Sequence, residues 1–177
     1  MRFIFSLRFW FVCTTTLLLI LSILDQLLRT PQIPLGIISF EFHGFASEPW
    51  ILDWNSQQRS LVGFNLGLDF LFIVSYSTLL WIWTSTLKRK LIRQCIQTAI
   101  ITAALLDVVE NFCLLQILWN GTAHVVMSKV ASISASLKFF LLIVIITTFP
   151  IYRIIFKQKQ GLKDKKQNLT ARPVNRA

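Results

Sequence analysis

Four long apolar segments dominate this sequence and restrict the folds that are open to it. A transmembrane helix needs about 20 predominantly apolar residues. The segments that meet this length are residues 4–28, 61–87, 96–119 and 130–156. Charged residues make up only 15% of the 177 residues, whereas soluble domains contain about 25%. The sequence therefore predicts an all-α membrane protein, in which residues 1–156 form a single bundle of four transmembrane helices.

Lysine and arginine are divided unequally between the two sides of such a bundle. One side holds fourteen of them, namely Arg2, Arg8, Lys88, Arg89, Lys90, Arg93 and the eight that follow residue 152. The other side holds Arg29, Arg59 and Lys129. Positive residues accumulate on the cytoplasmic side of a membrane. We therefore expect both termini in the cytoplasm and a retained first segment, because no small-residue cleavage site follows it.

The segment at residues 157–177 is polar and basic and shows no hydrophobic periodicity. This composition predicts a disordered cytoplasmic tail. The tail can bind anionic membrane lipids, each basic residue contributing about 1 kcal/mol near the surface, or it can serve only to set the topology. No aromatic residue alternates with its charges, so nucleic acid is not an expected partner.

The loop between the first two segments, from Arg29 to Ser60, is the longest connection on the outer side. Ser47 is a suitable N-cap, and Pro49 is tolerated in a first helical turn. Trp50 and Trp54 would then share one helical face, as expected for a membrane-interface anchor. The sequence thus predicts a short interfacial helix in this loop.

Metal and cofactor sites are not expected. Glu41, His43 and His124 are the candidate ligands in the outer loops, but no H-E-x-x-H or comparable spacing is present. The three cysteines, Cys13, Cys95 and Cys113, form no C-x-x-C pair, which argues against redox chemistry and a disulfide framework.

Several ionisable residues lie inside the apolar segments. At 1.5 Å per residue, Asp69, Glu110 and Lys138 reach a similar depth in the outer half of the bundle, with Asp107 closer to the middle. Each such charge costs about 2.5–3.5 kcal/mol at the centre of a helix, so these side chains should face inward and meet one another or water. The predicted site or polar network consists of Asp25, Asp69, Tyr76, Asp107, Glu110, Asn111 and Lys138.

Two interpretations of this network are open. It can stabilise helix packing, to which interhelical hydrogen bonds contribute about 0.6 kcal/mol on average, and the G-x-x-x-G at Gly63 and Gly67 would support close packing. Alternatively, it lines a pocket for a small amphipathic or cationic ligand or a lipid. The remaining alternatives are a non-catalytic subunit of a membrane complex or homo-oligomer, and a carboxylate acid/base enzyme acting on a lipid-soluble substrate. No nucleophile motif supports catalysis, and no catalytic residue is assigned.

Three motifs occur in a characteristic order: P-L-G-I-I-S-F-E at residues 34–41, G-L-D-F-L-F at residues 67–72 and L-D-V-V-E-N at residues 106–111. With S-L-K-F at residues 136–139, they resemble a family of small bacterial four-span membrane proteins. The resemblance covers residues 31–142. It implies a multi-pass protein of the bacterial cytoplasmic (inner) membrane and assigns no activity. A looser similarity, used only as an analogy, relates the four spans and buried carboxylates to the sterol isomerase and sigma-2 receptor fold.

Overall fold

The computed structural model describes residues 6–31, 36–38, 54–120 and 125–170. Four long helices account for most of these residues: α1 (Leu7–Leu27), α4 (Ser56–Ser85), α5 (Lys90–Asn120) and α6 (Val125–Thr170). The described residues contain no β-strand. All four helices are long and apolar enough to cross a membrane, α6 over its stretch Val125–Tyr152. The prediction of an all-α fold with four such helices is confirmed for these residues.

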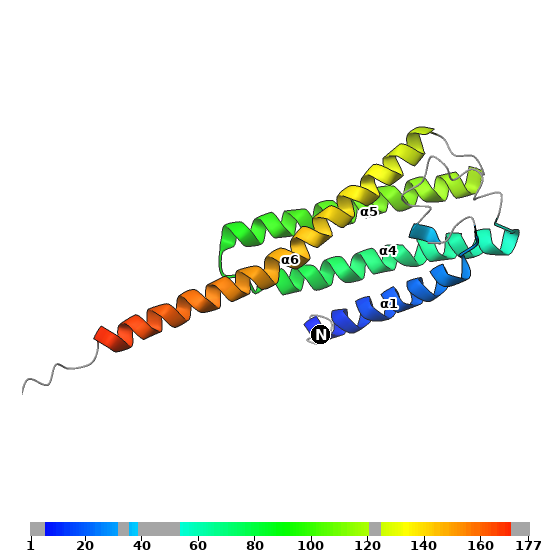
Figure 1. The fold of residues 1–177 in the computed structure, drawn as a ribbon. Helices are drawn as coiled ribbons and strands as arrows, with labels where there is room; N and C mark the ends of the chain where they lie inside the picture. Colours follow the sequence, from blue (N-terminus) through cyan, green and yellow to red (C-terminus); the bar gives the residue numbers. More distant parts are fainter. Residues whose placement is uncertain (1–5, 32–35, 39–53, 121–124, 171–177) are drawn as a thin grey trace, which may run out of the picture. The chain divides into compact units, whose positions relative to one another are not determined.

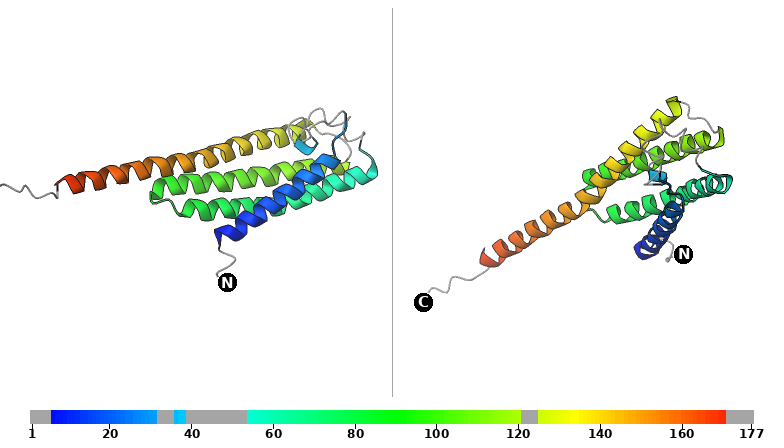
Figure 2. Two further views of the ribbon diagram at one scale, coloured as in Figure 1. Left: turned by 60° about the horizontal axis from the view of Figure 1, so that its bottom comes forward. Right: turned by 45° about the vertical axis from the view of Figure 1, so that its right-hand side comes forward.

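The chain divides into two compact units, Met1–Leu142 and Ile143–Ala177. Within the first unit, α1 packs along α4, and α4 packs along α5 (Figures 1 and 2). The turn between α4 and α5 is short and is closed by backbone hydrogen bonds from Thr86 and Leu87 to the last turn of α4. Such a short connection makes α4 and α5 antiparallel neighbours.

Helix α4 begins at Ser56, five residues before the apolar segment that predicted it. Asn55 and Gln58 form a capping box: the Gln58 N–H donates to Asn55 Oδ1 at 2.9 Å, and the Asn55 N–H donates to Gln58 Oε1 at 3.0 Å. This reciprocal cap satisfies two backbone donors that would otherwise lack an intrahelical partner. A polar first turn therefore extends the helix beyond its apolar part.

Helix α6 continues to Thr170, although the sequence predicted a disordered tail from residue 157. The segment contains many lysine and glutamine residues, which have favourable helix propensities. A lack of hydrophobic periodicity therefore did not exclude a helix here. Pro150 lies inside α6, and residues 171–177 are outside the described part.

The apolar core of the first unit lies at the end where α1 finishes and α4 begins. Trp54 is only 1% exposed, and its Nε1–H donates to the Leu28 carbonyl at 3.3 Å. Leu28 and Trp54 pack with residues of α4, α5 and α6, namely Val62, Leu66, Leu114, Ile117 and Ala131. The expectation that Trp54 anchors the chain at a membrane interface is therefore wrong. The rest of the predicted interfacial helix, with Trp50, lies outside the described residues.

The sequence also suggested that the two glycines of the G-x-x-x-G motif allow a neighbouring helix to pack closely, and among the described residues the structure shows no such close contact at either glycine. A Cβ atom added to Gly67 would meet nothing within 4 Å, and one added to Gly63 would lie at an ordinary 3.6 Å from Leu118. Neither glycine is needed to admit a neighbouring backbone. The helices instead meet through larger apolar side chains and through the polar contacts of the site.

Candidate functional site

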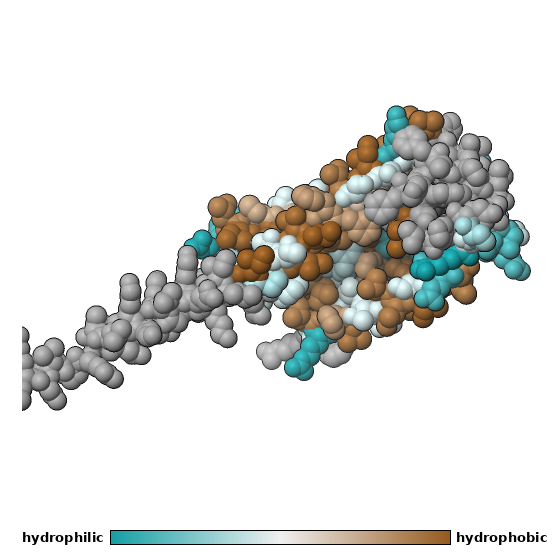
Figure 3. Space-filling view, viewed as in Figure 1, coloured by the Kyte–Doolittle hydropathy of each residue, from teal (hydrophilic) through white to brown (hydrophobic). Residues whose placement is uncertain are grey.

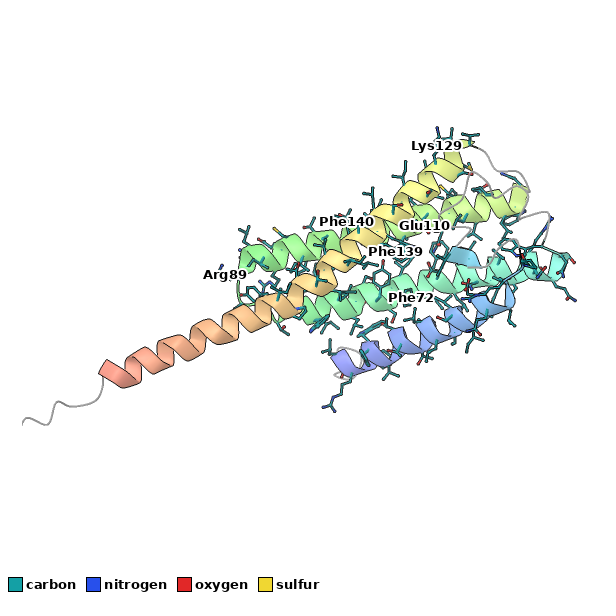
Figure 4. The ribbon with its side chains drawn as sticks, viewed as in Figure 1. Phe72, Arg89, Glu110, Lys129, Phe139 and Phe140 are labelled. Carbon is teal, nitrogen blue, oxygen red and sulfur yellow. The ribbon has the colours of Figure 1, made fainter. Side chains whose placement is uncertain are left out.

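Three charged side chains from α5 and α6 meet inside the first unit. Lys138 Nζ lies 2.6 Å from Asp107 Oδ1 and 2.7 Å from Glu110 Oε2. The three side chains, here called the ion-pair triad, are 6%, 4% and 0% exposed, respectively. Asp107 and Glu110 are one turn apart on α5, so one ammonium group reaches both carboxylates. Figure 4 labels Glu110 on α5 and, on α6, Phe139, which follows Lys138.

Tyr76 of α4 joins this triad. Its hydroxyl donates to Asp107 Oδ2 at 3.0 Å, so both oxygens of Asp107 accept a hydrogen bond, one from the tyrosine and one from Lys138. The Tyr76 ring packs against Phe72 with the ring centroids 5.3 Å apart. Asp107 is thereby held by groups on two other helices, which fixes its position between α4 and α6.

Asp69 and Asn111 form a second polar pair beside the triad. Asn111 Nδ2 donates to Asp69 Oδ2 at 2.6 Å. Among the described residues, Asp69 Oδ1 has no hydrogen-bond partner, and neither has the buried Asn111 Oδ1. Asp69 is half-buried, whereas Asn111 is completely buried. The pair therefore presents acceptor oxygens that no described protein group satisfies.

A cavity of about 310 Å³ adjoins these groups. Its polar lining includes Asp69, Tyr76, Asp107 and Lys138, which lie well inside α4, α5 and α6; this part is here called the deep end of the cavity. Asp25 and Arg29, near the end of α1, also line the cavity. The rest of the lining is mostly apolar and includes Leu18, Leu21, Leu66, Phe72, Phe139 and Leu142. A cavity with apolar walls and a few polar groups has the character of a small-molecule site.

Not every predicted site residue faces this cavity. Among the described residues, Glu110 and Asn111 do not line the cavity. Glu110 contacts Lys138, and Asn111 contacts Asp69, and these two partners line it. The face formed by Asp107, Glu110 and Asn111 is therefore divided, with Asp107 at the cavity wall and the other two behind it. Ser136, which precedes Lys138 by two residues, is exposed and donates to the Ser132 carbonyl of its own helix.

Asp25 lines the same cavity, but its contacts lie at the loop end. Asp25 Oδ1 accepts the N–H of Ile37 at 2.6 Å, and Oδ2 accepts Arg29 Nη2 at 3.2 Å. Gly36, just before Ile37, has a φ of 56°, in the left-handed region that favours glycine. Asp25 thus holds the short turn at residues 36–38, of which Ile37 and Ile38 also line the cavity.

Sequence reasoning missed this contact between α1 and the turn, together with Arg29, Phe72 and Phe139 in the cavity lining. The P-L-G sequence at residues 34–36 carried a usable signal, because a glycine shortly after a proline is typical of a turn with positive φ. The aromatic residues gave no such signal, because the sequence contains 15 phenylalanines and several of them, such as Phe64 and Phe112, are exposed.

No group of three or more histidine, cysteine, aspartate or glutamate residues that could hold a metal ion occurs within residues 6–31, 36–38, 54–120 and 125–170. Glu41, His43 and His124, the loop candidates, lie outside those ranges. Comparison with protein-family models, curated proteins and solved structures finds no match to this chain. The resemblance to the bacterial four-span family therefore stays a prediction, and function is argued from the helices and the cavity.

Proposed function

We propose that this chain is an integral membrane protein that binds a small amphipathic or cationic molecule, or a lipid, in its acidic cavity. The main support is the cavity itself, which combines apolar walls with Asp69, Asp107 and Lys138. A polar group in a low-dielectric site destabilises the protein unless a hydrogen-bond or ion-pair partner satisfies it. An occupant that pairs a polar group with an apolar body matches both parts of this lining.

Insertion into a membrane is supported by the surface of the helices. Large apolar side chains on four different helices are more than half exposed, for example Phe11, Leu71, Phe112 and Ile133. In Figure 3, hydrophobic residues cover most of the visible helix surface, and hydrophilic residues gather near the helix ends. Such a surface is unfavourable in water and favourable in hydrocarbon.

For the orientation, we propose a bacterial cytoplasmic membrane with both termini in the cytoplasm. The support is the excess of lysine and arginine at the N-terminus, between α4 and α5, and after residue 152. This orientation would place the end of α1 and the start of α4, and hence the part of the cavity near Asp25, on the outer side.

Single cysteines test this orientation. In a variant without native cysteines, Ser56→Cys lies at the start of α4, and Thr86→Cys lies just after its end; both positions are exposed. A membrane-impermeant maleimide applied to intact cells is expected to label Ser56→Cys, and to label Thr86→Cys only after permeabilisation. The opposite labelling pattern would show an inverted topology.

Filling the cavity tests ligand binding. Leu21 lines the cavity, whereas its neighbour Ile20 does not line it and is exposed. Native mass spectrometry of gently purified protein is expected to show a retained small molecule in the wild type and in Ile20→Trp, and its loss in Leu21→Trp. The added indole takes up the space of the occupant in only one of the two matched variants. Equal retention by both variants would contradict the proposal.

A non-catalytic role in a larger membrane complex is the second candidate function. It is favoured by Glu110, a fully buried member of the triad that joins α5 to α6 without lining the cavity. Polar contacts between membrane helices serve packing as well as binding. If this role is the correct one, Leu21→Trp should leave the cellular phenotype of the protein intact, because filling the cavity would not change the outer helix surfaces.

A further inference from the structure

The hydrogen-bond donors at the deep end of the cavity are already engaged. The Tyr76 hydroxyl donates to Asp107, and Lys138 Nζ contacts both Asp107 and Glu110. This end of the cavity still has a hydrogen-bond acceptor to offer, because Asp69 Oδ1 has no partner in the described part of the chain. Asp69 is half-buried, and a carboxylate oxygen can only accept hydrogen bonds. A matching occupant must therefore bring a donor.

The formal charge of the region points to the same chemistry. The carboxylates of Asp69, Asp107 and Glu110 stand against the single ammonium group of Lys138, which gives −2 when all four groups are ionised. Excess charge of one sign is costly in a low-dielectric interior. An anionic occupant would increase this excess, whereas a monovalent cation would reduce it to −1.

The lining around Asp69 suits a cation that carries an apolar chain. Phe72, Tyr76 and Phe139 line the cavity, and aromatic ring faces attract cations. Leu18, Leu21 and Leu142 offer apolar surface for a hydrocarbon chain. Asp69 Oδ2 is occupied by Asn111, so Oδ1 is left to accept one directed hydrogen bond from the cation.

We infer that the occupant of this cavity is a lipophilic amine whose protonated N–H group donates to Asp69 Oδ1, with its hydrocarbon chain along the leucine-lined wall. This inference rests on the proposed binding function and specifies its ligand class. The N–H requirement follows because a quaternary ammonium group has no proton to donate and would leave Oδ1 unsatisfied. Sites built for a hydrogen bond discriminate strongly against analogues that lack it.

The test uses four ligands with the same chain, namely octylamine, octyltrimethylammonium, octanol and octanoate, added to the full-length protein in zwitterionic lipid nanodiscs. Binding is measured by native mass spectrometry and by the shift in Tm. We expect wild-type protein to bind octylamine about tenfold or more tightly than octyltrimethylammonium, and to bind octanoate most weakly. The common chain gives all four ligands the same hydrocarbon contribution to lipid partitioning.

Asp69→Asn is the matching protein variant, because an asparagine carbonyl still accepts from Asn111 while the charge is removed. It should lose about tenfold or more of the affinity for octylamine and keep the octanol affinity within about threefold, since the new amide NH2 at the Oδ1 position can donate to the oxygen of a neutral hydroxyl but not to an ammonium group. The unchanged octanol affinity would show that the cavity is intact. Equal octylamine affinity in Asp69→Asn would overturn the assignment of Asp69.

The remaining outcomes separate the two proposals. Equal binding of octylamine and octyltrimethylammonium, or tightest binding of octanoate, would overturn the amine inference and leave a binding cavity in place. A Tm increase with sodium chloride as large as that with octylamine hydrochloride would show that a bare cation suffices, and would also overturn it. If no ligand binds and the purified wild type retains no small molecule, the proposed binding function fails as well.

Discussion

Replacing Lys138 with methionine is expected to lower the free energy of unfolding by about 3–5 kcal/mol, the cost of breaking a buried ion pair from one side. Methionine has a similar length and removes the charge together with the N–H donors. Asp107 and Glu110, whose oxygens lie 2.6 and 2.7 Å from Lys138 Nζ, would then face each other without the ammonium group. Unfolding in mixed detergent micelles, followed by circular dichroism, measures the loss.

Two further variants separate charge from helix packing. Lys129→Met makes the same substitution at an exposed position of α6 and should change stability by less than about 0.5 kcal/mol. Glu110→Gln in the Lys138→Met background removes one of the two facing carboxylates and should recover a substantial part of the loss. If Lys138→Met is as stable as the wild type, the triad contributes no net pairing energy.

The ion-pair triad could be predicted from the sequence because helix-face spacing and depth along the helices together locate its three residues. Asp107 and Glu110 share a helix face through their i, i+3 spacing, and counting residues along helices that cross a bilayer brings Lys138 to their depth. Inward orientation then follows from the cost of charge in hydrocarbon. The structure joins these three residues by direct contacts.

The rotation of each helix about its own axis could not be predicted from the sequence. Whether Glu110 lines the cavity or lies behind it depends on a rotation set by packing, which residue spacing does not specify. Asn111 pairs with Asp69 instead of completing the cavity wall for the same reason. The burial of Trp54 could not be predicted either, because a tryptophan near an apolar segment fits a membrane interface and a protein core equally well.

The ends of the helices show which sequence signals were sufficient and which were not. The apolar segments located four helices but missed the polar first turn of α4, although Asn55 and Gln58 have the spacing of a capping box. The extension of α6 to Thr170 is carried by residues of good helix propensity without an apolar face. Hydropathy reports the part of a helix that suits a membrane, not the whole helix.

Gly36→Ala is expected to destabilise the protein by at least about 2 kcal/mol, from two causes that add. A φ of 56° costs an L-residue about 1–2 kcal/mol. The new methyl group would also overlap Asp25 Oδ1 and lie 2.8 Å from Asp25 Cγ, which displaces the carboxylate that holds the Ile37 N–H. The turn at residues 36–38 should then loosen, and retention of the bound molecule should fall. Thermal unfolding and native mass spectrometry measure the two effects.

Gly67→Ala is the matched control, because a methyl group there meets open space on a regular helix and should be neutral or stabilising by up to about 1 kcal/mol. A double-mutant cycle then divides the cost at Gly36. Asp25→Ala removes the overlapping carboxylate, so Gly36→Ala should cost less in that background by the part due to the overlap and lost hydrogen bond. The part due to backbone conformation should remain, together with the contact of the new methyl group with the Asp25 backbone carbonyl oxygen at 2.9 Å. Equal costs in both backgrounds would show that the turn does not depend on Asp25.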